Sequence, residues 1–466
     1  MATPRTTGAG SSGGSAAAQG SRAFVYFVSA VAATSGLLFG FDIAVINGAI
    51  VFLEKEWHLS ELQTELAASS LLVGCIFGAA FGGWLSDLWG RRNALLLSAF
   101  LFAVSAIGAS LPHSLEEFAV ARVLGGLAIG VASVLAPLYI AEISPARIRG
   151  RLVALNQMAI VSGILLSYLA NWGLSFLGSG SWRYMFAVAA IPSLVFFIAL
   201  FFVPESPRWL MEKGRELEAR QVLERATGLE EATIAIDSLK EVIQLESGTL
   251  SELFAPGVRR ALGLAVVLAI MQQWAGVNTV LFYGSKILSD QVGATSALGA
   301  NVLIGLINFV CTIIALGLID RLGRKPLLIF SCAAMAVSHV ILAICFHLTS
   351  PPAYLIVGAM LLCVASFAVG LGPGVWVVLS EIFPTKIRGR AMAVATVALW
   401  VACTVLTMTF LTLSRTLGRT GAFLIYGGMC AFTALFVLFV VPETRGKTLE
   451  EIEKLWLVLP VRRSSV

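Results

Sequence analysis

Apolar residues occur along this chain in twelve long runs that are separated by shorter polar connections. Each run has about twenty residues, the length that an α-helix needs to cross a hydrocarbon layer ~30 Å thick. The runs are too long and too continuously apolar for barrel strands, in which apolar and polar residues would alternate. The pattern predicts twelve membrane-spanning helices, at approximately 24–48, 65–88, 93–111, 118–141, 152–175, 183–203, 258–284, 297–319, 326–348, 353–379, 391–413 and 420–441.

The composition agrees with this prediction and the charges orient it. Hydrophobic residues make up 58% of the 466 residues and charged residues 13%, about half the charged share of soluble domains. Lys and Arg gather in every second connection, and by the positive-inside rule both termini are cytoplasmic. The net charge of +5 therefore follows from the topology and requires no nucleic-acid partner. These basic connections are 91–92, 147–151, 205–260, 321–325, 386–390 and the tail from 445 onward.

Three segments lie outside the predicted spans. Residues 1–21 are rich in Gly, Ser, Ala and Thr and are expected to be a disordered tail, without the apolar core of a signal peptide. Residues 205–257 contain amphipathic stretches, which predict short helices at the cytoplasmic face. Residues 443–466 form a cytoplasmic tail. All seven cysteines fall inside predicted spans, so no disulfide framework is expected.

The chain also repeats itself. GGWLSDLWGRRNALLL at 82–97 is echoed by LGLIDRLGRKPLLIF at 316–330, and APLYIAEISPARIRGR at 136–151 by VWVVLSEIFPTKIRGR at 375–390. The repeat predicts two six-helix halves in the same orientation, residues 22–204 and 258–442. Parallel repeats of this kind place a substrate site between the halves, near the middle of the membrane.

These motifs carry a family resemblance. The paired D-x-x-G-R-[RK] and E-x-x-x-x-x-x-R-G-R segments, PESPRWL at 204–210, QQWAGVNTVLFY at 272–283 and PETRGKTLEE at 442–451 resemble the sugar porter family of the major facilitator superfamily. The resemblance covers residues 24–456. It implies an all-α membrane protein of twelve transmembrane helices, in two six-helix parallel pseudo-repeats with a short cytoplasmic helical bundle. It also implies alternating-access transport of a monosaccharide, without a cofactor or a metal.

Polar side chains within apolar spans are the candidates for sugar binding. Amides can pair with sugar hydroxyls without bringing a charge into the membrane, and aromatic rings can cover the C–H faces. Bonding between helices is the alternative interpretation for any single amide. Pro373 and its flanking glycines should also break span 10. By resemblance, the binding residues are Gln157, Gln272, Gln273, Asn278, Asn308 and Trp376, with Phe39, Phe282 and Trp400 beside them.

A set of charged residues ends the spans on the cytoplasmic side. By resemblance, their ion pairs hold the two halves together inside the cell when the site opens outward, and separate when it opens inward. The alternative is that the arginines only set the topology. The candidate gate residues are Arg91, Arg92, Glu142, Arg149, Glu205, Arg208, Arg321, Arg324, Glu381 and Arg388.

Two opposite charges lie inside predicted spans, Asp42 in span 1 and Arg122 in span 4. A carboxylate at a helix centre costs roughly 2.5–3.5 kcal/mol on insertion scales, so it should face protein or water and have a partner. Both spans belong to one half, so an ion pair between the two would neutralise both charges. Such residues form the coupling pair of the proton-coupled sugar porters that this chain resembles. A purely structural pair is the alternative.

The resulting prediction is a symporter of a proton and a hexose or pentose, in the plasma membrane and acting as a monomer. An uncoupled sugar facilitator and a membrane sugar sensor remain open as alternatives. An enzyme is not expected, because no nucleophile, base and orienting group occur together. Among the four histidines, His339 and His347 lie in span 9, which has no acid to relay a proton.

Overall fold

The computed structural model describes residues 20–245, 250–255, 258–349, 351–383 and 387–445, and in these ranges all regular secondary structure is helical. Most of the predicted N-terminal tail, residues 1–19, lies outside the described residues, as do the cation at Lys386 and positions 446–466 of the C-terminal tail. At the end of the predicted tail, the Ser21 hydroxyl accepts a hydrogen bond from the Phe24 amide (3.2 Å) and caps the first helix.

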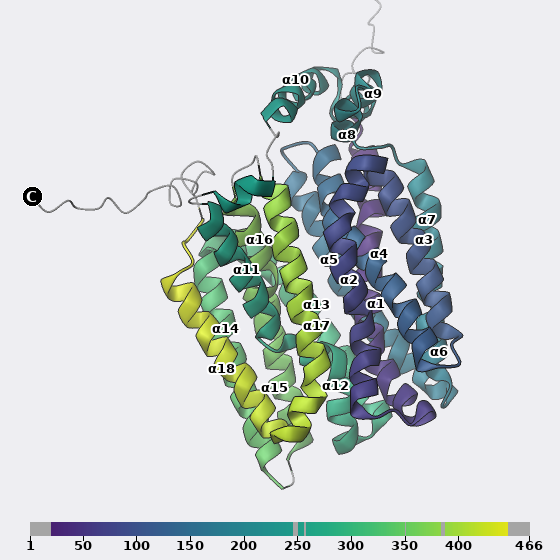
Figure 1. The fold of residues 1–466 in the computed structure, drawn as a ribbon, viewed down its shortest axis with the longest axis vertical. Coiled ribbons are helices and arrows are strands. Elements are labelled where there is room, and N and C mark those ends of the chain that lie inside the picture. The colour runs from purple at the N-terminus through teal and green to yellow at the C-terminus, as the bar shows by residue number, and fades with distance from the viewer. Residues whose placement is uncertain (1–19, 246–249, 256–257, 350, 384–386, 446–466) are drawn as a thin grey trace, which may run out of the picture.

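The first half forms six membrane-crossing segments that lie together in Figure 1. Glycines bring two of them into close contact: a Cβ added at Gly126 would lie 1.8 Å from the Leu71 carbonyl oxygen. Small residues allow membrane helices to pack this closely. The segments are α1 (Arg22–Trp57), α2 (Glu61–Trp89), α3 (Arg91–Ser110), α4 (Leu115–Ile143), α5 (Arg149–Leu174) with η1 (Ser175–Leu177), and α6 (Ser181–Ala187) with α7 (Ala190–Ala199) and η2 (Leu200–Phe202).

The second half contains the other six segments. In the described residues, eleven helical segments are long and apolar enough to cross a membrane, and the last of them, Arg388–Phe439, divides at Leu417 into two helices. The predicted total of twelve is therefore confirmed. The helices are α11 (Val258–Trp274), α12 (Val277–Val292), α13 (Ala294–Leu322), α14 (Arg324–His347), α15 (Ala353–Ser366), the π-helix η4 (Phe367–Leu371), α16 (Gly372–Glu381), α17 (Arg388–Thr416) and α18 (Gly418–Phe439).

Two spans of the second half are interrupted. Span 10 breaks where it was expected, with the π-helical turn η4 directly before Pro373. Span 7 was predicted as one continuous helix over 258–284. It is instead two helices, α11 and α12, which are separated at Ala275 and Gly276, where Gly276 has a left-handed φ of 84°. The span also extends to Val292, because the polar residues from Lys286 onward end the apolar run early but continue the helix.

The segment between the halves forms a small helical bundle, as predicted. It contains α8 (Pro207–Glu212), α9 (Glu216–Thr227), α10 (Leu229–Leu245) and η3 (Leu250–Phe254). The bundle is attached to the first half, because the Trp209 indole donates to the Asp87 carbonyl (3.1 Å) and the Ser21 amide to the Arg225 carbonyl (2.9 Å). The end of the molecule that carries α8, α9 and α10, uppermost in Figure 1, is called the linker end below, and the opposite end the far end.

Candidate functional site

Three of the predicted binding amides meet at the break between α11 and α12. Asn278 donates to the Gln273 side-chain oxygen (2.5 Å), and Gln273 donates to the Gln272 side-chain oxygen (3.1 Å). Gln272 in turn donates to the carbonyls of Leu371 and Gly372 (2.9 and 3.0 Å), at the interrupted part of span 10. This amide cluster, Gln272, Gln273 and Asn278, therefore joins the two broken spans of the second half.

The other predicted binding residues come from both halves. The Gln157 and Asn308 amides form no hydrogen bond within the described residues, so their donors and acceptors remain available. Gln157 is half-buried and Asn308 is buried. Phe39 and Trp400 meet across the two halves, with ring centroids 5.7 Å apart. Trp376 is half-buried on α16, whereas Phe282 is only 1% exposed.

The structure pairs the two charges that lie inside the first half. Arg122 donates to the Asp42 carboxylate (3.0 Å) and, through its second terminal nitrogen, to the Asp42 backbone carbonyl (2.8 Å). The Arg122 side chain is 0% exposed and that of Asp42 6%. One carboxylate oxygen of Asp42 has no hydrogen-bond partner among the described residues. The predicted pairing is present, and Asp42 keeps one oxygen free to accept a proton.

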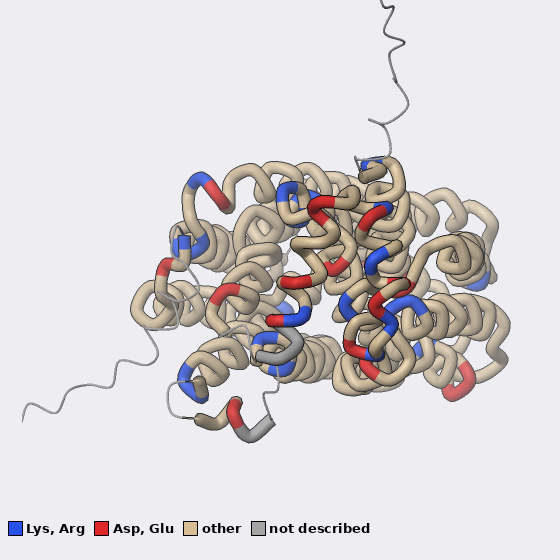
Figure 2. The backbone as a smooth tube through the Cα atoms, turned by 90° about the horizontal axis from the view of Figure 1, so that it is seen from above, with Lys and Arg blue, Asp and Glu red and all other residues tan. Residues whose placement is uncertain are grey.

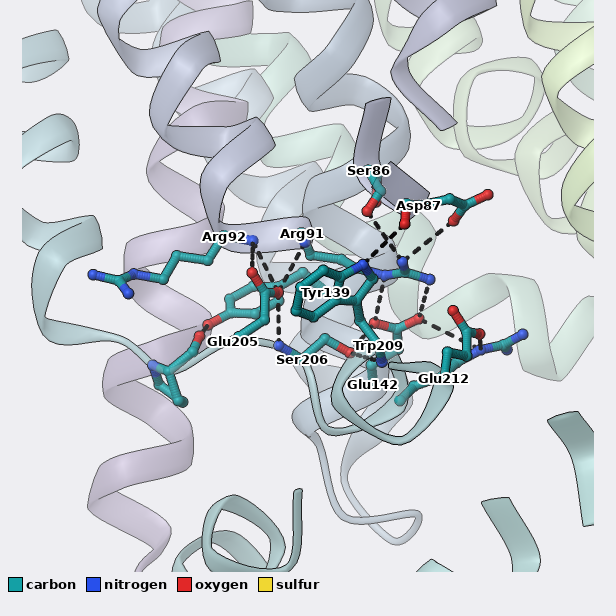
Figure 3. A network of polar contacts seen from close by, with 12 residues as sticks. Ser86, Asp87, Arg91, Arg92, Tyr139, Glu142, Glu205, Ser206, Trp209 and Glu212 are labelled. Atoms are coloured by element: carbon teal, nitrogen blue, oxygen red, sulfur yellow. Dashed lines mark hydrogen bonds and ion pairs between the residues drawn. The ribbon is translucent and has the colours of Figure 1, made fainter. Parts of the chain in front are cut away.

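A polar network joins helices of the first half to one another at the linker end (Figure 3). Arg91 donates to both oxygens of Glu142 (3.2 and 3.3 Å) and to Asp87 (3.3 Å). The Glu205 carboxylate accepts from the backbone amides of Arg91 and Arg92 (2.8 and 3.1 Å), at the N-terminus of α3. Carboxylates are stabilised at helix N-termini, where amides have no partner within the helix.

The second half repeats this network with equivalent residues. Arg324 donates to Glu381 (2.8 Å), and the Glu443 carboxylate accepts from the amides of Arg324 and Lys325 (3.2 and 3.0 Å) at the start of α14. The Thr444 hydroxyl also donates to Glu381 (2.5 Å), as the Ser206 hydroxyl does to Glu142. The sequence analysis did not include Glu443, Ser206 or Thr444 among the gate residues, although the paired motifs PES and PET contain all three.

The pKa values of the two capping carboxyls, Glu205 and Glu443, are shifted in opposite directions. Burial raises the pKa of the Glu205 carboxyl, and the amides that bond it only partly offset this. Burial acts in the same direction on Glu443, but the amides of Arg445, Lys325, Arg324 and Thr444 outweigh it and lower the pKa of that carboxyl. The difference arises because Glu205 is more deeply enclosed.

The remaining gate residues lie in the first or last turns of helices at the same end of the molecule. Arg149 donates to the Ser144 carbonyl (3.5 Å) and Arg388 to the Phe383 carbonyl (3.2 Å), Arg208 lies 3.9 Å from Glu142, and Arg321 is exposed. Charged segments are numerous in the view from the linker end (Figure 2). The ion pairs from Arg91 to Glu142 and from Arg324 to Glu381 each join elements of one half. In this conformation they do not provide the predicted lock between the halves.

The halves are instead joined at the far end. Asn47 of α1 donates to the Leu281 carbonyl of α12 (2.8 Å) and accepts from the Ser285 amide (2.7 Å). Nearer the end, Lys286 forms an ion pair with Glu54. The fully buried Glu65 of α2 accepts from the amide and the hydroxyl of Thr412 in α17 (both 2.8 Å). The far end is therefore closed by polar contacts between the halves, which the sequence analysis did not predict.

Comparison with known proteins agrees with this architecture. A family model described as "Sugar (and other) transporter" matches residues 28–456. The chain belongs to this sugar transporter family. It is 39% identical to the putative metabolite transport protein YwtG of Bacillus subtilis, covering 93% of this chain and 95% of the relative. It is 38% identical to the D-xylose-proton symporter of Escherichia coli, covering 93% of this chain and 96% of the relative.

Among solved structures, the chain resembles the xylose transporter XylE from E. coli in its partially occluded inward open conformation. The TM-score is 0.82 at 36% identity, and the match covers 91% of this chain and all of the other. As a member of the sugar transporter family with twelve spans in two halves, the chain is a multi-pass membrane transporter that works by alternating access, and not an enzyme.

Proposed function

We propose that this transporter moves one monosaccharide, a hexose or a pentose, together with a proton into the cell. The observation that carries the proposal is the buried pair of Asp42 and Arg122, because an uncoupled carrier of a neutral sugar needs no ionisable pair in its first half. A relative with 38% identity is a D-xylose-proton symporter. In this proposal the linker end is cytoplasmic, the protein resides in the plasma membrane, and it functions as a monomer.

The amide cluster supports a sugar as the substrate. Each amide offers both donors and acceptors, which is what a ring of hydroxyl groups requires. The free amides of Gln157 and Asn308 come from the two different halves, so the contacts of a sugar held by both would change when the halves move relative to each other. The rings of Phe39 and Trp400 meet across the same interface and would cover an apolar face of the sugar.

The contacts between the halves support alternating access to this site. At the far end, Asn47, Lys286 and Glu65 each bond the opposite half. At the linker end, the ion pairs from Arg91 to Glu142 and from Arg324 to Glu381 stay within one half. This arrangement corresponds to a carrier closed to the outside. In the outward-facing state we expect these far-end contacts to open, and the linker-end charges to become the contacts between the halves.

Proton coupling follows from the chemistry of the pair. The Arg122 cation favours the Asp42 carboxylate, whereas burial without that cation favours the neutral acid. Protonation of Asp42 would weaken its bond to Arg122 and allow the first half to rearrange with the sugar bound. The proton and the sugar would then cross in the same step.

Transport by the purified protein in proteoliposomes tests this proposal. We expect counterflow with at least one of D-xylose, D-galactose, D-glucose and L-arabinose, and accumulation of that sugar when a pH gradient, acid outside, is imposed. Asp42→Asn should abolish accumulation but retain counterflow, because asparagine imitates the neutral acid at nearly the same volume. The matched control, Asp237→Asn, alters an exposed carboxylate on α10 and should accumulate sugar like the unmodified protein.

Three results would contradict the proposal or a part of it. If Asp42→Asn still concentrates sugar against its gradient, Asp42 is not the residue that couples the proton. If the unmodified protein moves sugar without a co-transported proton in a pH-dye assay, the protein is a facilitator. If the protein binds these sugars but shows no counterflow, it is a sensor.

A further inference from the structure

The break between α11 and α12 leaves the Ala275 carbonyl without its helical partner. In a continuous helix the Ala275 carbonyl would accept from the amide of Thr279, four residues later. Thr279 instead donates both its amide and its hydroxyl to the Gly276 carbonyl (3.1 and 2.7 Å). Ala275 is 0% exposed, so water cannot supply the missing hydrogen bond from the surface. A buried carbonyl of this kind requires another donor.

Two side chains from neighbouring helices supply that bond. His339 of α14 places its Nε2 atom 2.8 Å from the Ala275 oxygen, and Cys430 of α18 places its Sγ atom 3.2 Å from the same oxygen. The Nδ1 atom of His339 has no hydrogen-bond partner among the described residues. Because the carbonyl can only accept, the proton belongs on Nε2, and His339 is a neutral donor to the break.

The position of the His339 ring is fixed by its surroundings. The ring is 0% exposed, stacks on Phe423 (5.9 Å between centroids, 24° between planes) and lies against Tyr426 at 6.0 Å. A Cβ added at Gly276 would lie 2.9 Å from the Tyr426 Cβ atom and 3.0 Å from the His339 Nε2 atom. The break is therefore packed tightly against α14 and α18, which lie side by side in Figure 1.

We propose that His339 anchors the hinge between α11 and α12, and that it acts as a positioning residue for sugar binding. This inference rests on the proposed function. Gln272 and Gln273 precede the break, and the bonds from Gln272 to Leu371 and Gly372 hold that side in place independently of His339. Asn278 follows the break, so its position depends on how the chain leaves Gly276. The anchor keeps Asn278 beside Gln273 while the outer part of α12 exchanges its contacts with α1.

A double-mutant cycle tests the anchor, with binding of D-xylose and D-galactose measured by calorimetric titration. Replacing both members of an interacting pair reveals their coupling. In the unmodified protein we expect Asn278→Ala to weaken binding about tenfold, the scale for a lost buried polar partner. In His339→Ala the same change should have little further effect. Gln157→Ala, on α5 and away from the break, should weaken binding equally in both backgrounds.

Two substitutions separate the hydrogen bond from the loss of volume. His339→Gln keeps a donor at nearly the reach of Nε2 and should restore the effect of Asn278→Ala, whereas the shorter His339→Asn should not. Ser338→Ala is the matched control, because Ser338 is also fully buried on α14, but its hydroxyl bonds the Ala359 carbonyl (2.7 Å) and not the Ala275 carbonyl at the break. In the Ser338→Ala background, Asn278→Ala should have its full effect.

A measurement without sugar separates this inference from the proposed function. Spin labels carried by unnatural amino acids at the exposed positions Lys55 and Gln291 report the distance between α1 and α12. We expect a broader distance distribution in His339→Ala than in Ser338→Ala. An unchanged distribution, or an undiminished effect of Asn278→Ala in His339→Ala, would overturn the anchor. If no sugar binds while the distribution broadens, the anchor stands and the proposed substrate class is wrong.

Discussion

At the scale of single residues, the members of the amide cluster bond one another. Gln273 accepts from Asn278 and donates to Gln272. A sugar hydroxyl can bind the donors and acceptors that these bonds leave unused, or it can replace one of the bonds. A bond that is replaced adds only the difference between two buried hydrogen bonds, so affinity depends on how completely the sugar satisfies the cluster.

We predict that Gln273→Ala and Asn278→Ala each weaken sugar binding by about 1–3 kcal/mol, because each leaves buried partners without a bond. Calorimetric titration of the purified variants measures the change. Thr433→Ala serves as the control, since it removes a fully buried hydroxyl of α18 that bonds only its own helix at Met429. Unchanged affinity in both amide variants would place the sugar elsewhere.

Some residue contacts could be predicted from the sequence and others could not. The pairing of Asp42 with Arg122 was expected, because two opposite charges within one half have few other partners at that depth. The contact between His339 and Ala275 was not expected. The contact exists because Gly276 has a positive φ and breaks the helix there. A single glycine in an apolar run does not reveal from the sequence whether the helix continues through it.

At the scale of helices, a carboxylate from the end of each half caps the helix that follows its D-x-x-G-R motif. Gly90 and Gly323 have φ values of 96° and 94°, and a Cβ at either would lie within 2.7 Å of the capping carboxylate. The glycines are therefore required both for the turn and for the approach of Glu205 and Glu443. The repeated motifs predicted the elements, but not that these acids bond backbone amides rather than arginines.

We predict that the two caps respond to pH with opposite sign. The pKa of the Glu443 carboxyl is lowered in the folded protein, so it stabilises the fold above the ordinary value of 4.5, and this stabilisation is lost as the pH falls through the folded pKa. The pKa of the Glu205 carboxyl is raised, so its stabilisation of the fold is full below the ordinary value and is lost as the pH rises through the folded pKa.

Thermal unfolding in detergent measures both caps, if scan rates are matched between samples. On acidification from about pH 7 to about pH 4, the unmodified protein should lose stability relative to Glu443→Gln and gain it relative to Glu205→Gln. The stability difference between the unmodified protein and each variant is followed against pH. If it changes in the same direction for both variants, the two carboxyls are not distinguished by their burial.

At the scale of the whole molecule, the two ends differ in what their polar residues join. The linker end contains the repeated motifs, and its ion pairs stabilise each half as a unit. The far end lacks such motifs, and single residues such as Asn47 and Glu65 bond the opposite half there. The fold and the halves could be predicted because they follow from apolar runs and repeats. The closed end could not, because its contacts depend on which of two conformations the halves adopt.

We predict that Asn47→Ala shifts the carrier toward the state that is open at the far end. Asn47 is 0% exposed and bonds α12 at Leu281 and Ser285, across the interface between the halves. Its removal deletes these bonds only while the far end is closed, at a cost of about 1–3 kcal/mol. The Leu281 carbonyl keeps a hydrogen bond from the Tyr168 hydroxyl (3.1 Å). Because about 1.4 kcal/mol changes a ratio of states tenfold, the population should shift measurably. The label distance between positions 55 and 291 should lengthen.

The matched control is Asn171→Ala. Asn171 is also a buried asparagine, 1% exposed, but its amide bonds the Val45 carbonyl (3.1 Å) inside the first half, so its loss should affect both states alike. Lengthening in Asn47→Ala with no change in Asn171→Ala would assign the closure to bonds between the halves. Equal lengthening in both would mean that any loss of packing around α1 opens the far end, and that Asn47 has no specific part in closing it.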